Sequence, residues 1–143
     1  MSSKQNIFHF KITILKDGKP SAYRIIAIDK KSTLYSFAEV ILENFDFGCN
    51  HCFGFYDNTD DRYDSNDFYE LFVDIDEESG DGAQSVKLNT IETAFAIRRN
   101  MLFLFDYGKE WKFLIELLGK KKSESGIQYP QLIESKGKAP KQY

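Results

Sequence analysis

The sequence predicts an α+β fold in which a mixed β-sheet carries one main helix, with a β-hairpin at the start and another towards the C-terminus. Alternating apolar residues near both ends of the ordered pattern indicate strands, and an apolar stripe at helical spacing lies between them. The 143 residues match the commonest domain size, and 42% are hydrophobic, including 13 Phe and 8 Tyr. Such a chain can bury an aromatic core without disulfides or metals.

The first predicted element is a β-hairpin followed by a helix. Residues 7–15 alternate in polarity, as a half-buried strand does. Asp17-Gly18 is a favoured hairpin turn, and residues 22–28 are rich in the β-branched and aromatic side chains of a returning strand.

The main helix is expected directly after this hairpin. Ser32 or Thr33 can cap its N-terminus, and Gly48 lies where the helix should stop. Its apolar residues are spaced by three and four and form one stripe: Leu34, Phe37, Ala38, Ile41 and Phe45.

Further strands are predicted at residues 52–56, 69–75, 101–107 and 111–117, with a short helix beginning near Asn89 or Thr90. The stretch 101–107 is almost continuously apolar, which is typical of a central strand buried on both faces. Gly108-Lys109 then forms the turn of the C-terminal hairpin. We expect one shared core that contains Phe8, Phe10, Ile12, Leu34, Phe37, Ile41, Phe103, Phe105, Phe113 and Ile115.

Charge is distributed unevenly along the chain. The net charge is −3, but residues 57–82 hold eleven acidic residues against Arg62 alone, whereas residues 120–143 hold six Lys against two Glu. We therefore expect one α+β domain over residues 1–119, and a basic, irregular tail over 120–143 that packs on that domain or trails from it.

The sequence has no feature of a secreted or membrane-bound chain. Its start alternates in polarity and lacks the continuous apolar region of a signal peptide, and no window reaches the ~18 apolar residues of a membrane span. With two Cys, a disulfide framework is not expected either. By elimination, the sequence predicts a cytoplasmic protein that does not bind membranes.

Several short strings resemble the plasmid pRiA4b open-reading-frame-three-like family over nearly the whole chain. They are Ser32-Thr33-Leu34, Phe45-Asp46-Phe47, His51-Cys52-Phe53-Gly54-Phe55, the stretch 103–111, Tyr129-Pro130 and Gly137-Lys138-Ala139-Pro140. The resemblance implies an α+β fold with a β-grasp-like start and an association with plasmids and mobile elements. It implies no settled activity. Lys109 and Phe113 depart from the Asp and His that the family often has, so a site built from those groups is not expected here.

Cys49, His51 and Cys52 form the most reactive-looking string. Two thiolates and an imidazole could hold a soft metal, or the Cys pair could cycle as a dithiol. A structural zinc needs four ligands, however, and the only other histidine is His9 in the first strand. We therefore expect structural cysteines, with no metal and no cofactor.

A second set, His51, Asp106 and Trp111, follows a helix or flanks the predicted hairpin at strand ends. If the strands are neighbours, a carboxylate beside the imidazole would favour its charged form, and the pair would serve as a ligand anchor or pH-responsive latch with an aromatic wall. The alternative is that Asp106 accepts turn N–H groups and that Trp111 lies in the core.

The sequence favours a small binding or interaction domain, with an unidentified ligand or protein partner, over an enzyme; no catalytic residues are predicted. One alternative is an accessory nucleic-acid-binding protein of mobile elements, because the basic tail combines Lys with Tyr129 and Tyr143. The other is a metal-dependent or hydrolytic enzyme that uses His51, Asp106 or the Cys49/Cys52 pair.

Overall fold

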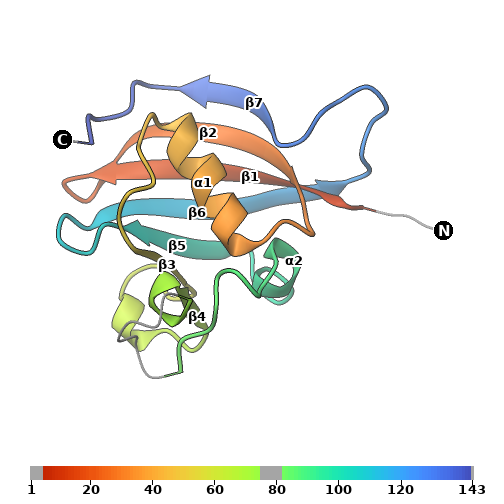
Figure 1. Ribbon diagram of the computed structural model, residues 1–143. Helices are drawn as coiled ribbons and strands as arrows, with labels where there is room; N and C mark the ends of the chain where they lie inside the picture. The colour runs from red at the N-terminus through yellow and green to blue at the C-terminus, as the bar shows by residue number, and fades with distance from the viewer. Residues whose placement is uncertain (1–4, 75–81, 143) are drawn as a thin grey trace.

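Seven strands form one sheet, and helix α1 lies across one of its faces in the computed structural model, which describes residues 5–74 and 82–142 (Figure 1). The strand order is β4-β3-β5-β6-β1-β2-β7. The strands are β1 (Ile7–Lys16), β2 (Lys19–Asp29), β3 (Phe53–Tyr56), β4 (Phe68–Glu70), β5 (Asn100–Phe105), β6 (Trp111–Lys121) and β7 (Gln131–Lys136). The helices are α1 (Leu34–Asn44), α2 (Ile91–Ala94) and the short 3₁₀ turns η1 (Arg62–Asp64) and η2 (Leu71–Val73).

The α+β class with one main helix is confirmed, but the prediction of a mixed sheet is wrong. All six pairings between these strands are antiparallel. β1 lies between β2 and β6 and runs antiparallel to both, and the β-grasp assignment is not confirmed. Composition and periodicity identify strands, but the direction of a pairing depends on contacts between distant segments.

The N-terminal hairpin and α1 begin as the sequence predicts. Asp17 and Gly18 both have positive φ, 54° and 77°, as a two-residue turn matched to strand twist requires. Of the two candidate caps, Thr33 caps α1: its hydroxyl accepts the N–H of Ser36 at 3.1 Å. The helix ends at Asn44, and the left-handed residue that follows is Asp46 (φ 60°) rather than the predicted Gly48.

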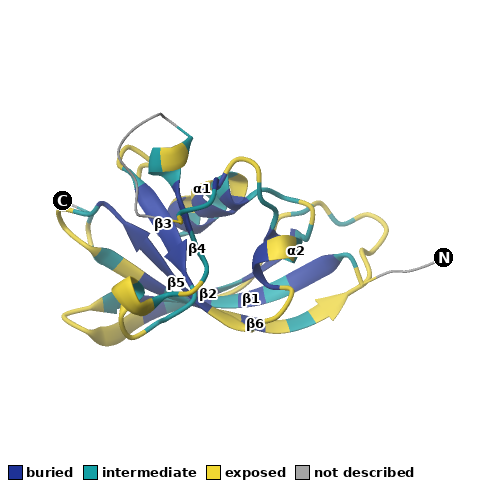
Figure 2. Cartoon of the chain, turned by 90° about the horizontal axis from the view of Figure 1, so that it is seen from below, coloured by how far each residue is buried: buried dark blue, intermediate teal, exposed yellow. Residues whose placement is uncertain are grey.

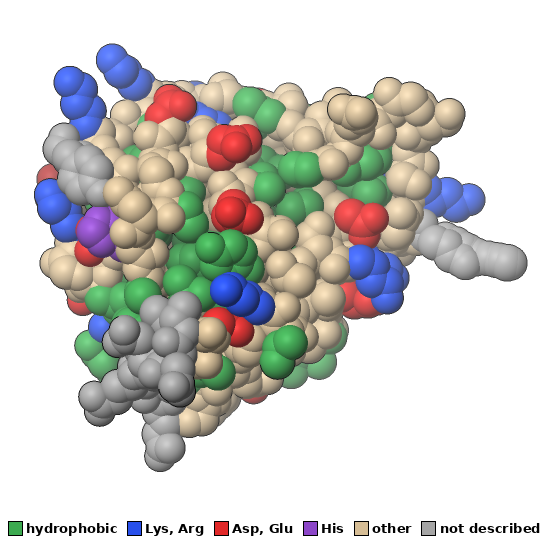
Figure 3. Space-filling view, in the orientation of Figure 1, with side chains coloured by type: hydrophobic (Ala, Val, Ile, Leu, Met, Phe, Trp, Pro, Cys, Tyr) green, Lys and Arg blue, Asp and Glu red, His purple; other side chains and the backbone are tan. Residues whose placement is uncertain are grey.

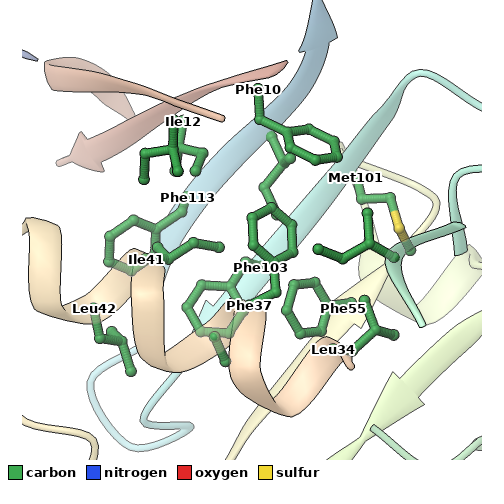
Figure 4. Close-up of a cluster of buried hydrophobic side chains, with 14 of the residues drawn as sticks. Phe10, Ile12, Leu34, Phe37, Ile41, Leu42, Phe55, Met101, Phe103 and Phe113 are labelled. Carbon is green, nitrogen blue, oxygen red and sulfur yellow. The ribbon is translucent and has the colours of Figure 1, made fainter. Parts of the chain in front are cut away.

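The hydrophobic core lies between α1 and the sheet (Figure 4). All ten residues predicted to share a core belong to it. Its rings meet at the centre, where Phe37 and Phe55 stack at 6.0 Å and Phe103 lies 5.4 Å from Phe113. Buried positions follow the strands of the sheet, while the hairpin tips are exposed (Figure 2).

The opposite face of the sheet carries a smaller cluster built on Tyr56, Leu102 and Leu104. This second cluster explains why β5 is buried from residue 101 to 105 on both faces, as its continuous apolar run predicted. Two carboxylates of the acidic loop after β3 are not freely solvated, because Asp57 and Asp67 both form ion pairs with Arg98.

Two strand predictions need correction. The strand expected at 69–75 ends at Glu70, the chain then turns through η2, and residue 75 lies outside the described residues. The irregular conformation expected after residue 119 is wrong for β7, which pairs with β2, and β6 itself continues to Lys121. β7 is an edge strand exposed along most of its length, so it lacks the apolar alternation by which strands are recognised.

The short second helix starts at the position where the sequence predicts a cap. Thr90 is the cap residue of α2, and its hydroxyl accepts the N–H of Thr93. No helix within the described residues is both long enough and apolar enough to span a bilayer.

Candidate functional site

His51 and Asp106 meet at the end of the sheet where β3 begins and β5 ends. Phe53 pairs with Phe105 in the β3–β5 ladder, and one position beyond it the N–H of Asp106 donates to the carbonyl of Cys52 at 2.9 Å. This extension of the ladder brings the two side chains together, with His51 Nε2 3.6 Å from Asp106 Oδ2. The structure therefore juxtaposes the two residues that the sequence singled out.

The turn after β5 holds Asp106 in a fixed orientation. Its backbone lies in the left-handed region (φ 63°), and its carbonyl accepts the N–H groups of Lys109 and Glu110. Its Oδ1 accepts the N–H of Gly108 at 3.2 Å and that of Lys109 at 3.4 Å. Asp106 is thus a turn residue through Oδ1, as the alternative from the sequence expected, and a neighbour of His51 through Oδ2.

The pair lies at a boundary between core and solvent. The His51 side chain is 39% exposed and that of Asp106 is 12% exposed. The imidazole packs edge-on against the ring of Phe105, with centroids 5.8 Å apart. A carboxylate oxygen accepts hydrogen bonds, and an imidazole nitrogen donates or accepts according to whether it carries a proton. The rim formed by the His51 and Asp106 side chains can therefore offer both a hydrogen-bond donor and an acceptor to a polar group.

Trp111 begins the next strand and is paired with Phe105 in the β5–β6 ladder. Its half-buried ring packs edge-on against Phe47 at 5.0 Å, which agrees with the core role considered for it. Its indole Nε1 is buried and, among the described residues, has no hydrogen-bond acceptor. An unpaired buried donor costs about 1–3 kcal/mol, so this N–H is an unsatisfied feature close to the rim.

A tyrosine cluster formed by Tyr56 and Tyr107 lies next to the Asp106 turn, because Tyr107 follows Asp106 in the chain. The Tyr56 hydroxyl donates to the buried carboxylate of Glu70 and lies 2.7 Å from the Tyr107 hydroxyl. The Arg62 guanidinium covers both rings, 5.6 Å from that of Tyr56 and 5.2 Å from that of Tyr107. Burial is the main cause that raises the pKa of both phenols above the ordinary value.

Sequence reasoning missed this cluster because its members are separated in the chain and match no motif. One signal was present: Gly54 interrupts an otherwise aromatic strand, and a glycine there often marks a close approach. A Cβ at Gly54 would lie 2.6 Å from the Tyr107 hydroxyl and 2.8 Å from that of Tyr56.

The two cysteines are free thiols, with Cys49 exposed and Cys52 partly buried. Desolvation, followed by the Glu39 carboxylate, raises the pKa of the Cys49 thiol, which disfavours a reactive thiolate. Within residues 5–74 and 82–142, no group of three or more His, Cys, Asp or Glu side chains is arranged to hold a metal ion.

The lysines of the C-terminal region do not form one patch. Lys121 is level with Ile7 and Asp29 at one end of β2, whereas Lys136 pairs with Tyr23 near the middle of that strand. Six strand residues separate the two levels, about 20 Å at the usual rise. On the face shown in Figure 3, basic side chains are also scattered among acidic and hydrophobic ones.

The comparisons with known proteins agree with this fold. The family model described as plasmid pRiA4b ORF-3-like protein matches residues 6–142. A similar solved structure is that of MM3350, a protein of unknown function from Methanosarcina mazei Go1, with a TM-score of 0.75 and 19% identity over 94% of this chain and 71% of that one. At this identity the likeness concerns the fold alone. No curated protein matches the sequence.

Proposed function

The chain belongs to the plasmid pRiA4b ORF-3-like protein family, and we propose that it is a binding domain that anchors a polar group of its ligand or partner between His51 and Asp106. The juxtaposition of these two side chains at a partly exposed rim is the observation that carries the proposal. The half-buried Trp111 ring lies on the neighbouring strand, and the buried Phe105 ring supports the His51 imidazole from the core side.

The geometry of the pair favours binding over acid–base catalysis. At 3.6 Å, Nε2 and Oδ2 are within ion-pair range but beyond hydrogen-bond distance, so a polar group that bridges both atoms replaces one long contact with two hydrogen bonds. Oδ1 is engaged by backbone N–H groups, which orient the carboxylate without motion of the turn. A pre-oriented anchor lowers the entropic cost of binding.

Two alternatives receive less support. A hydrolytic or metal-dependent enzyme would use His51, Asp106 or the Cys49/Cys52 pair, but the raised pKa of the Cys49 thiol makes this sulfur a poor nucleophile at neutral pH. An accessory nucleic-acid-binding role in mobile elements would rest on the C-terminal lysines, but Lys121 and Lys136 lie at levels of the sheet about 20 Å apart instead of along one track.

The proposal is tested by NMR titration of the ¹⁵N-labelled protein with three probes: methylguanidinium chloride, acetamide and sodium acetate. We expect saturable shifts for at least one probe, centred on residues 48–53 and 105–111. The shifts should be lost in His51→Gln and Asp106→Asn but kept in His9→Gln, which changes the other histidine.

The result would contradict the proposal if all three probes failed to bind, or if their shifts survived both rim substitutions. A separate assay distinguishes catalysis. Hydrolysis of p-nitrophenyl acetate that exceeds the solution rate and disappears in both rim variants would favour the hydrolytic alternative.

A further inference from the structure

A second concave surface lies where the segment after β7 folds back against the end of α1. The groove has a volume of about 460 Å³, in the range of small-molecule sites. Its charged lining consists of Arg24, Lys138 and Lys141 against one carboxylate, that of Asp46. It is distinct from the His51–Asp106 pair, so the inference drawn from it does not rest on the proposed function.

The wall of this groove is held by specific contacts. Gly137 adopts φ 84° against Ala22, and Ala139 packs on the hydrophobic core. At the far end, Gln142 Oε1 accepts the N–H of Gly48 at 2.8 Å, and its Nε2 donates to the Asn50 side chain at 3.2 Å. The segment is therefore fixed in place, and its lysines extend from an anchored backbone.

Arg24 is the unusual member of the lining. It is only 8% exposed, and its guanidinium lies over the ring of Phe45 at 4.8 Å. Nε donates to the carbonyl of Asn44 at 2.9 Å, and Nη1 donates to the carbonyls of Tyr23, Lys136 and Gly137. These bonds orient the guanidinium but supply no opposite formal charge.

The third nitrogen of Arg24, Nη2, makes no hydrogen bond within residues 5–74 and 82–142. It is not sealed from solvent, because the single buried side-chain N or O atom without a partner among those residues is Trp111 Nε1. Arg24 also lines the groove, so Nη2 is the guanidinium nitrogen that can donate a hydrogen bond to a ligand.

The cations around the groove are unpaired within the described part of the chain. No carboxylate oxygen of the described residues lies within 4.0 Å of a side-chain nitrogen of Arg24, Lys138 or Lys141. The six ion pairs that form among those residues all lie outside the groove. A largely buried guanidinium without a counter-ion is costly, and an anion in the groove would relieve that cost.

We propose that this groove binds the phosphoryl group of a small molecule. A phosphate dianion matches the excess of two positive charges in the lining, and an oriented guanidinium beside two exposed lysines is a usual phosphate-binding combination. Nucleic acid fits less well, because Lys120 and Lys121 lie at the other end of the sheet, opposite Phe8 and Ile7, and do not continue the basic surface of the groove.

The experiment is a calorimetric titration of the full chain with inorganic pyrophosphate, repeated with inorganic phosphate and with a short DNA duplex. The test variant is Lys138→Gln/Lys141→Gln. The control is Lys121→Gln/Lys122→Gln, which removes the same charge from exposed lysines at the opposite end of β2. Arg24 is left intact because it ties α1 to the chain after β7, and its Nε–H signal is followed by NMR.

We expect saturable pyrophosphate binding that weakens about tenfold or more in the test variant and less than about twofold in the control. The Arg24 Nε–H signal should shift with the same midpoint. Absence of saturable binding, or equal weakening in the two variants, would overturn the proposal. So would DNA binding at the groove that pyrophosphate does not displace.

Discussion

Asp106 Oδ2 lies 3.6 Å from His51 Nε2, while the other oxygen of the same carboxylate accepts two backbone N–H groups of the turn that follows β5. One side chain therefore serves the fold and the candidate site through different atoms. Because the two roles use different oxygens, substitutions at this position can separate them.

The first prediction concerns stability at Asp106. Asn keeps an oxygen for the turn and tolerates positive φ, so Asp106→Asn should change the free energy of unfolding by less than about 1 kcal/mol. Asp106→Ala loses the acceptor and strains the left-handed residue, and should cost about 2–3 kcal/mol. Urea unfolding of both variants measures the difference. Equal costs would show that Oδ1 does not support the turn.

The second prediction concerns Gly54. A Cβ there would meet the Tyr107 and Tyr56 hydroxyls at under 3.0 Å, and both hydroxyls belong to rings that are packed in place. Gly54→Ala should therefore destabilise the protein by about 1–3 kcal/mol. Adding Tyr107→Phe removes the nearest oxygen and should recover part of the loss. A double-mutant cycle that proves additive would contradict the close approach.

The third prediction follows from the raised phenol pKa values of Tyr56 and Tyr107. In the unfolded chain these groups release protons near pH ~10, whereas the folded protein retains them, so the unfolded state then binds fewer protons. Stability should be insensitive to these groups below pH ~9 and should fall as the pH rises above ~10.

Tyr56→Phe should make this alkaline decline shallower, although it also removes the hydroxyl bonded to Glu70 and lowers stability at neutral pH. Urea unfolding at a series of pH values measures both effects. Tyr63→Phe, on an exposed ring, provides the control. An unchanged slope in Tyr56→Phe would indicate that burial does not hold this phenol in its protonated form.

The fourth prediction concerns the aromatic core. Phe37 and Phe113 are fully buried, so replacing either with Ala should lower the free energy of unfolding by about 3–5 kcal/mol. Tyr63→Ala, at an 81% exposed residue, should change it by less than about 0.5 kcal/mol. Losses below about 1 kcal/mol at both phenylalanines would contradict their place in the core.

Local pattern was sufficient for much of the fold. The alternation before Asp17-Gly18 and the apolar spacing after Thr33 determined a hairpin and a helix, because each buries one face against the same core. The sequence also predicted that His51 and Asp106 lie at strand ends, and the pairing of β3 with β5 brings them together.

Tertiary structure decided the features that depend on distant partners. β7 is a strand because the edge of β2 supplies its hydrogen bonds, although its own side chains are mostly exposed. Arg24 occupies an ordinary strand position in the sequence, and it becomes a buried cation only where α1 and the chain after β7 converge on it. Periodicity reports which face of an element is buried. The folded chain alone determines which polar atoms meet there, because such contacts join residues that are distant in the sequence, as Arg24 and Gly137 are.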